Sequence, residues 1–299
     1  MSVNQPDKSS DLRIRGYLDL MKLRVVELLL VTTLPALVLA QNGIPSVGLS
    51  IATILGGTLA AGSANAFNMV IESETDKLMK RTAKRPLVTG AVTRIQATVF
   101  AFTIGLLSLA IFYIFTTPLA TLLTAIAIAY YVLIYTIALK PNTSQNIVWG
   151  GAAGCMPVLI GWAAVTNSLT LVPVAFFMVI FFWTPPHFWA LAIKYKDDYS
   201  AAGIPMLPSV SSQSSVIGQM WFHTIAMVIS STALIQLAEL PVWALCATVL
   251  LGAVFTFQLF ALKESSENYD RVAAGIFHWS ITYLSLLSVL LVVAQLLSA

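Results

Sequence analysis

Charge is what this sequence lacks most. Of its 299 residues, 10% are charged and 58% are hydrophobic, whereas a soluble protein has about 25% charged residues. The mean hydropathy is +0.85. This composition excludes a water-soluble globule, a disordered chain and a nucleic-acid-binding protein. It predicts a protein whose surroundings are a lipid bilayer.

Cysteine is also scarce. Cys155 and Cys246 both lie in apolar runs, so we expect two small buried hydrophobic side chains and no disulfide framework. The first ten residues are polar and have neither the apolar core of a signal peptide nor the arginine-rich pattern of a transit peptide. We expect residues 1–16 to form a cytoplasmic tail and residues 17–299 to form one membrane domain.

Long uncharged stretches are abundant. A membrane-spanning helix needs about 20 mostly apolar residues, and polar, proline or glycine residues divide the longest stretches in two. The sequence therefore predicts an all-α protein with nine spanning helices. Paired helices are expected between Glu27 and Glu72, between Arg94 and Lys140 and between Lys140 and Lys194, and single helices at Val216–Leu237, Val242–Leu262 and Ile276–Ser298.

The basic residues indicate an orientation. With nine helices, all 16 Lys and Arg residues fall on the side of the N-terminus, and the opposite face carries only the acid Glu239. Cytoplasmic loops of membrane proteins carry the excess of Lys and Arg. We therefore expect a multi-pass protein of the cell (inner) membrane, with a cytoplasmic N-terminus and an external C-terminus.

A first polar cluster follows the second predicted helix. Asn68, Glu72 and Asp76 are spaced by four residues, which places them within one arc of a helix, together with Asn65. Acids at the end of a membrane helix are costly and usually functional, and their oxygens suit Mg²⁺. Five cations come directly after this motif in the chain. They could hold phosphate oxygens, or they could simply mark a cytoplasmic loop. They are Lys77, Lys80, Arg81, Lys84 and Arg85.

A second polar cluster follows the sixth predicted helix. Asp197 and Asp198 form another carboxylate group, and His187, Lys194 and Asp198 would share one face of a continuous helix. The two acidic groups could form two sides of one metal-diphosphate site, or the second could consist of ordinary interfacial ion pairs. A lone membrane histidine such as His187 is either a core residue or a ligand, and the sequence leaves both open.

Four further segments of the chain resemble those of a known protein family. They are KRTAKRPLVTG (80–90), SQNIVWGGAAGCMPVLIGWA (144–163), PPHFWALAIKYKDDY (185–199) and GIPMLP (203–208). With the motif at Asn68, Glu72 and Asp76, they resemble the UbiA superfamily of intramembrane prenyltransferases, and within it the branch that farnesylates heme. The family's Lys-Pro-Arg appears here as Lys22-Leu23-Arg24, and a second acid common in the superfamily is replaced by Ala202.

The resemblance implies a nine-helix UbiA-like bundle with a central cavity open to the cytoplasm. It implies farnesyl diphosphate and heme B as substrates and one or two Mg²⁺ ions as cofactor. The vinyl group of heme B would attack an allylic cation, and water would complete heme O. A heme A synthase or a terminal oxidase assembly factor is a possible partner. The implied metal ligands are Asn68, Glu72, Asp76, Asp197 and Asp198, the diphosphate contacts are Arg24, Lys77, Arg81, Arg85, Tyr135, Lys140 and Lys194, and the heme contact is His187.

Three alternatives stay open. Another UbiA-type enzyme would prenylate a different acceptor, such as an aromatic acid that is a quinone precursor. A transporter would place polar residues near the midplane in two related halves, whereas the charges here gather at one face. A structural subunit of a respiratory complex would tolerate Asn68→Ala, Glu72→Ala and Asp76→Ala.

Overall fold

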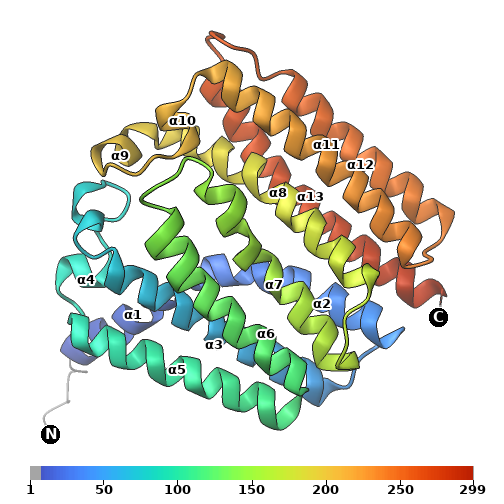
Figure 1. Ribbon diagram of the computed structural model, residues 1–299, viewed down its shortest axis with the longest axis horizontal. Coiled ribbons are helices and arrows are strands. Elements are labelled where there is room, and N and C mark those ends of the chain that lie inside the picture. Colours follow the sequence, from blue (N-terminus) through green and yellow to red (C-terminus); the bar gives the residue numbers. More distant parts are fainter. Residues whose placement is uncertain (1–7, 299) are drawn as a thin grey trace, which may run out of the picture.

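The computed structural model describes residues 8–298, apart from the side chains of residues 8–13 and 24–30. In these residues the chain is a bundle of long helices without strands (Figure 1). Among the described residues, eight helices are long and apolar enough to cross a membrane, so the chain is a multi-pass membrane protein. They are α3 (Val47–Ile71), α5 (Arg94–Phe115), α6 (Pro118–Ala129) continued by η2 (Tyr130–Leu139), α7 (Asn146–Thr166), α8 (Leu171–Lys194), α11 (Gln213–Leu237), α12 (Val242–Phe260) and α13 (Tyr269–Ser298).

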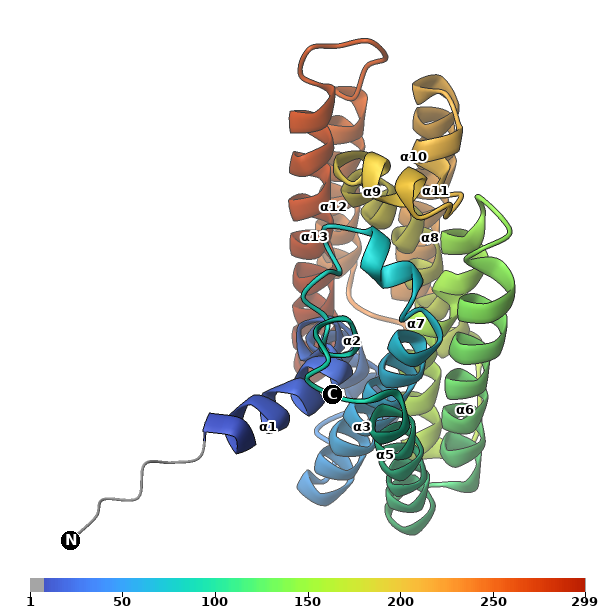
Figure 2. The same ribbon diagram turned by 90° about the vertical axis from the view of Figure 1, so that its left-hand side faces the viewer.

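The remaining helix of the predicted nine is the first in the chain, and it corresponds to α2 (Leu23–Gln41), which has 19 residues. After Leu23, side chains are described again only from Val31, and the stretch Val31–Gln41 is apolar but short. The count of nine is therefore not confirmed. The preceding helix α1 (Lys8–Met21) crosses the predicted boundary between tail and domain, and it leaves the bundle sideways (Figure 2).

The ends of the spanning helices follow the local chemistry of the sequence. Ser46 caps α3 by accepting a hydrogen bond from the backbone N–H of Leu49. Thr93 and Gln96 form a reciprocal capping box at the start of α5. Such caps satisfy N–H groups that a helix leaves unpaired at its first turn. The predicted breaks therefore coincide with real helix ends.

Short helices gather at one end of the bundle, which we call the charged end. Two of them follow α3 and two follow α8, and Figure 1 shows that α4, α9 and α10 lie at the same edge. The opposite end has only short turns between long helices. The four short helices are η1 (Thr75–Leu78), α4 (Pro86–Thr89), α9 (Lys196–Ala201) and α10 (Leu207–Val210).

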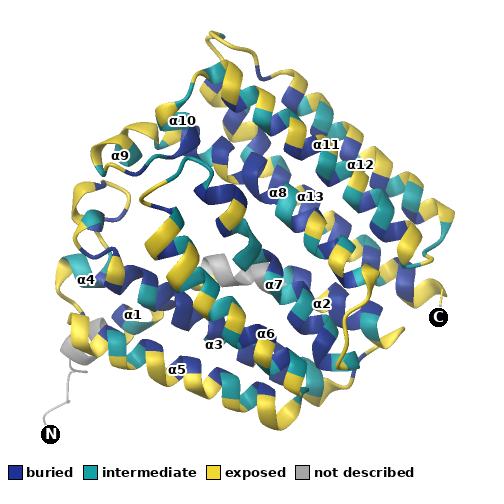
Figure 3. Cartoon of the chain, viewed as in Figure 1, coloured by how far each residue is buried: buried dark blue, intermediate teal, exposed yellow. Residues whose placement is uncertain are grey.

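The helices pack through buried faces and turn other apolar faces outward (Figure 3). Between membrane helices the attraction is van der Waals packing rather than escape from water. A large core joins α8, α11, α12 and α13, and a smaller cluster that includes Leu37, Phe112 and Ile160 closes the end of the bundle opposite the charged end. Cys155 is buried as expected, but the prediction for Cys246 is wrong, because α12 leaves this side chain exposed on its outer face.

Candidate active site

A cavity of about 320 Å³ runs through the middle of the bundle. Its volume lies at the lower end of the usual range for ligand pockets. One wall is a stripe of α3 that includes Thr53, Gly57, Ala60, Ala64 and Asn68. These positions recur every three or four residues, so they share one face of the helix. The cationic lining residues are Lys22, Arg81, Arg85 and Lys140.

The two acids of the first cluster lie beside this lining, but not on one continuous helix as expected. The helix α3 ends at Ile71, Glu72 is its C-terminal cap, and Asp76 belongs to η1. A hydrogen bond of 2.8 Å from the Asp76 N–H to the Glu72 carbonyl oxygen links the two elements. Both side chains are buried, with 7% and 1% exposure. The polar turn, rather than a helix face, brings them together.

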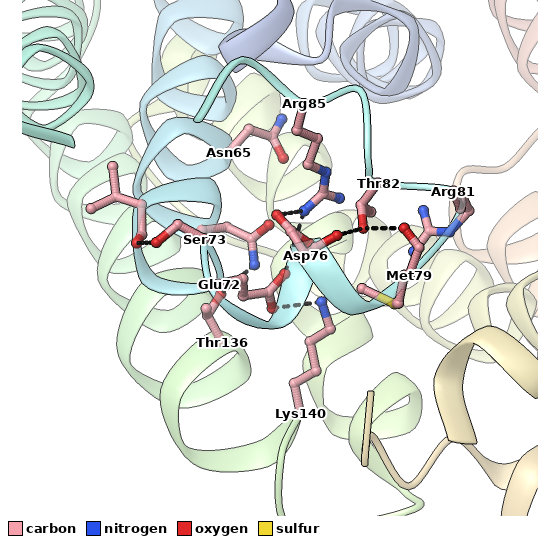
Figure 4. Close-up of polar contacts among 12 residues, drawn as sticks. Asn65, Glu72, Ser73, Asp76, Met79, Arg81, Thr82, Arg85, Thr136 and Lys140 are labelled. Carbon is pink, nitrogen blue, oxygen red and sulfur yellow. Dashed lines mark hydrogen bonds and ion pairs between the residues drawn. The ribbon is translucent and has the colours of Figure 1, made fainter. Parts of the chain in front are cut away.

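Two cations hold the acids (Figure 4). The Lys140 Nζ lies 2.5 Å from the Glu72 Oε1, and the Arg85 Nη1 lies 2.5 Å from the Asp76 Oδ2 and 3.7 Å from the Glu72 Oε2. Burial by itself would raise the pKa of Glu72, but the charge and hydrogen bond of Lys140, together with the charges of Lys22 and Arg85, outweigh it, so the pKa lies below its usual value. Burial lowers the pKa of Lys140, although Glu72 opposes that shift. Glu72 is therefore held as a carboxylate.

One oxygen of each carboxylate is left over. The Glu72 Oε2 and the Asp76 Oδ1 are buried and accept no hydrogen bond from the described residues. A buried oxygen without a donor is costly, and a hard cation such as Mg²⁺ is the ligand that carboxylate oxygens suit. No three His, Cys, Asp or Glu side chains cluster closely enough to hold a metal ion within the part of the chain that the structure describes. The pair fits a metal that completes its coordination with phosphate and water.

The two amides of the cluster bind the protein itself. The Asn68 Oδ1 accepts a 2.9 Å hydrogen bond from the Lys22 Nζ, and its Nδ2 donates to the Thr136 Oγ1 over 3.2 Å. The Asn65 Nδ2 donates to the carbonyl oxygen of Met21. Asn65 thus holds the backbone at the end of α1, and Asn68 holds the side chains of Lys22 and Thr136.

Lys22 is a cavity residue that the sequence analysis named only as part of a motif. It lies at the break between α1 and α2, with φ 52° and ψ 52° in the left-handed region. Burial lowers its pKa well below the usual value, and the charge of Arg85 adds to this shift. Its position in the altered Lys-Leu-Arg motif was the available signal. The side chain of Arg24, which was predicted to contact diphosphate, lies outside the described residues.

The segment η2 is a π-helix, and it orients the next group of lining residues. Residues five apart are hydrogen-bonded in a π-helix, whereas they lie about 140° apart around an α-helix. The Lys140 N–H bonds the Tyr135 carbonyl oxygen, and the Thr136 hydroxyl bonds that of Tyr131. Tyr131, Tyr135 and Lys140 all line the cavity. Tyr131 was not predicted, because the sequence gives no direct sign of a π-helix.

The second acidic cluster does not continue a helix face. The helix α8 ends at Lys194, and Tyr195 separates it from α9, so the predicted common face of His187, Lys194 and Asp198 is wrong. The Asp198 Oδ2 accepts a 3.1 Å hydrogen bond from the N–H of Arg81. Asp198 therefore lies beside the loop of the first cluster, while Asp197 is exposed.

Three predicted contacts lie elsewhere. His187 is buried between the rings of Trp183 and Phe277, and its Nδ1 lies 2.6 Å from the Ser280 Oγ. Lys77 is exposed and pairs with its neighbour Glu74, and Lys194 is an exposed residue near the ring of Tyr195. None of these three occurs among the described residues that line the cavity.

Fold and site together define a membrane-embedded prenyltransferase: this chain belongs to the UbiA prenyltransferase family, whose model matches residues 29–281. Two similar relatives are named protoheme IX farnesyltransferase. That of Renibacterium salmoninarum is 48% identical, with 94% of this chain and 89% of the relative covered. That of Frankia casuarinae is 47% identical, with 95% and 99% covered.

Solved structures share the fold at low sequence identity. Digeranylgeranylglyceryl phosphate synthase aligns with a TM-score of 0.78 at 15% identity, covering 95% of this chain and 99% of that one. A UbiA homolog from Archaeoglobus fulgidus bound to GPP and Mg²⁺ aligns with a TM-score of 0.67 at 16% identity, covering 93% and 99%. These likenesses support the predicted UbiA-like bundle.

Proposed function

We propose that this chain transfers the farnesyl group of farnesyl diphosphate to a vinyl group of heme B and so makes heme O. The carbon–oxygen bond to the diphosphate breaks, and a carbon–carbon bond to the vinyl terminus forms. Water adds the hydroxyl group and releases a proton. The observation that carries the proposal is the cluster of buried cations and carboxylates at the charged end of a long apolar cavity.

The cations of the lining would bind the diphosphate. Arg85 and Lys140 are held beside the cavity by the carboxylates, and Lys22 is held by Asn68. Fixed positive charges in a site that excludes water stabilise the charge that develops on a leaving diphosphate. Arg81, from the same loop as Arg85, would complete this set. These residues lower the barrier because they need no rearrangement as the bond breaks.

Glu72 and Asp76 are the residues that would hold Mg²⁺, through the two oxygens without hydrogen-bond donors. When bound, the metal ion would neutralise part of the diphosphate charge. The Asn68 side chain keeps Lys22 and Thr136 in place in this proposal. Asp198 holds the loop that presents Arg81.

The apolar cavity would protect the allylic cation from water. The rings of Tyr131 and Tyr135, whose centroids are 5.2 Å apart, belong to its lining near the cations. Aromatic faces attract positive charge, and more strongly where water is excluded. The two tyrosines would therefore stabilise the cation until the vinyl group attacks.

The charged end would face the cytoplasm of a cell with an inner membrane, because the basic loops lie there. Farnesyl diphosphate would enter from that side. Transfer of the product to a heme A synthase or an oxidase assembly factor is a further part of this proposal, and the basic face is where such a partner would meet the mouth of the site.

A direct assay tests the function. The purified chain is given labelled farnesyl diphosphate and either heme B or 4-hydroxybenzoate, with and without Mg²⁺. We expect heme O only with heme B and Mg²⁺. Asp76→Ala should lose at least about 100-fold in turnover, while Glu74→Ala, an exposed acid two residues away, should match the wild type. Prenylated 4-hydroxybenzoate, or full turnover by Asp76→Ala, would contradict the proposal.

A further inference from the structure

One large side chain lies at the part of the cavity that is farthest from the cations. Phe112 of α5 lines the cavity and is fully buried. Its ring lies so close to α3 that a β-carbon at Gly56 would come within 2.7 Å of it. The ring belongs to the hydrophobic cluster that includes Leu37, Ala120 and Ile160, and Ile160 also lines the cavity. Packed side chains therefore hold the ring in place.

The distance from the cations to this floor suits a prenyl chain. From Asn68 to Gly56, which lies beside Phe112, α3 extends over 12 residues and rises about 18 Å. The wall consists mainly of small side chains, so a narrow apolar chain can lie along it.

One position of the wall keeps the lower part of the cavity wide. Gly57 lines the cavity, and a β-carbon added there meets no atom within 4 Å. It lies one helical turn from Thr53, at the level of Phe112 and its neighbour Gly56. A larger side chain at 57 would therefore fill cavity space without displacing the protein.

We propose that Phe112 and Gly57 set the length of the prenyl chain that the site accepts: the ring limits the longest chain, and the glycine leaves room for the last isoprene unit of farnesyl. This inference rests on the proposed function, because it takes the cavity as the prenyl site. An apolar pocket discriminates chains by the space at its end, and one misplaced methylene already changes selectivity about 10-fold or more.

Two substitutions with opposite effects test the floor. Phe112→Leu should lengthen the cavity and raise kcat/KM for geranylgeranyl diphosphate relative to farnesyl diphosphate about tenfold. Gly57→Leu should shorten it and shift the ratio toward geranyl diphosphate by a similar factor. The controls are Phe115→Leu, on an exposed position of α5, and Gly48→Leu, on an exposed position of α3 where a β-carbon also meets nothing.

A binding assay without heme separates this inference from the proposed function. Competition among geranyl, farnesyl and geranylgeranyl diphosphate for the purified protein should show the same shifts. Unchanged chain-length ratios in Gly57→Leu, or equal shifts in the controls, overturn the floor assignment. If Phe112→Leu does not fold, Gly57→Leu decides alone. Shifted binding ratios without any heme product would instead contradict heme B as the acceptor and support the role of Phe112 and Gly57 in chain length.

Discussion

Single residues at the mouth of the cavity are paired in a way that ties stability to function. Lys140 and Glu72 are both buried, and their charged atoms lie 2.5 Å apart. A charge buried with a partner is tolerated, but a charge that loses its partner is strongly destabilising. The exposed pair of Lys77 and Glu74 has similar geometry, at 2.7 Å, in water. The two pairs therefore form a natural comparison.

We expect Lys140→Met to lower the stability by about 3 kcal/mol, because Glu72 is left buried without its hydrogen-bonded cation. The double variant Glu72→Gln/Lys140→Met should regain most of this loss, since a neutral amide costs less to bury than a carboxylate. Neither should make product. Thermal unfolding in detergent measures the stability, and Lys77→Met should leave the melting temperature unchanged. Wild-type stability of Lys140→Met would show that the pair is not a structural unit.

Part of this site could be predicted from the sequence. Charged residues are rare in this chain, at 10%, so Glu72, Asp76 and Lys140 stood out. Their pairing could not be derived, because Lys140 lies 68 residues from Glu72 along the chain and Arg85 is one of five cations in the loop after the acids. Lys77 and Lys194 were predicted from their closeness to the acids along the chain, which does not show which way a side chain points.

At the scale of secondary-structure elements, the π-helix η2 has the largest effect on the site. It places Tyr135 and Lys140 on the same face, whereas an α-helix would place them about 140° apart. Thr136 supports this geometry from both sides, since its hydroxyl donates to the carbonyl oxygen of Tyr131 and accepts from the Asn68 Nδ2.

Thr136→Val should therefore lower turnover several-fold and stability by about 1–2 kcal/mol, because it leaves a buried amide donor unpaired. Thr136→Ser keeps the hydroxyl and should behave like the wild type. Steady-state turnover and thermal unfolding of both variants give the answer. A Val variant with wild-type values for both would mean that the hydroxyl does not hold η2 against α3.

The bounds of the other helices were largely predictable. Charges, prolines and polar pairs mark the ends of membrane helices, and the breaks near Asn42, Thr117 and Asn167 all fall where the structure has turns. The continuation of the second and sixth helices through their acidic clusters was wrong. Periodicity alone cannot reveal that a polar segment leaves the helix and folds back over its end, as η1 and α9 do.

At the scale of the whole molecule, labelling from each side of the membrane tests whether α2 is a spanning helix. If α2 crosses the membrane, an N-terminal tag and the α12–α13 turn lie on the same side, opposite the α2–α3 turn. In a Cys246→Ser background, Ser46→Cys should react with an impermeant thiol reagent in intact cells. Ser266→Cys and the tag should become accessible only after permeabilisation. A tag accessible together with residue 46 would mean that α2 does not span.

The left-handed backbone at Lys22 has a consequence for engineering. Glycine adopts this conformation at little cost, whereas a lysine is strained there by about 1–2 kcal/mol. A replacement by glycine would relieve the chain while removing the amine that Asn68 holds. The two effects oppose each other in a melting curve. A screen for thermal stability would therefore not reject Lys22→Gly, although this change removes one cation from the site.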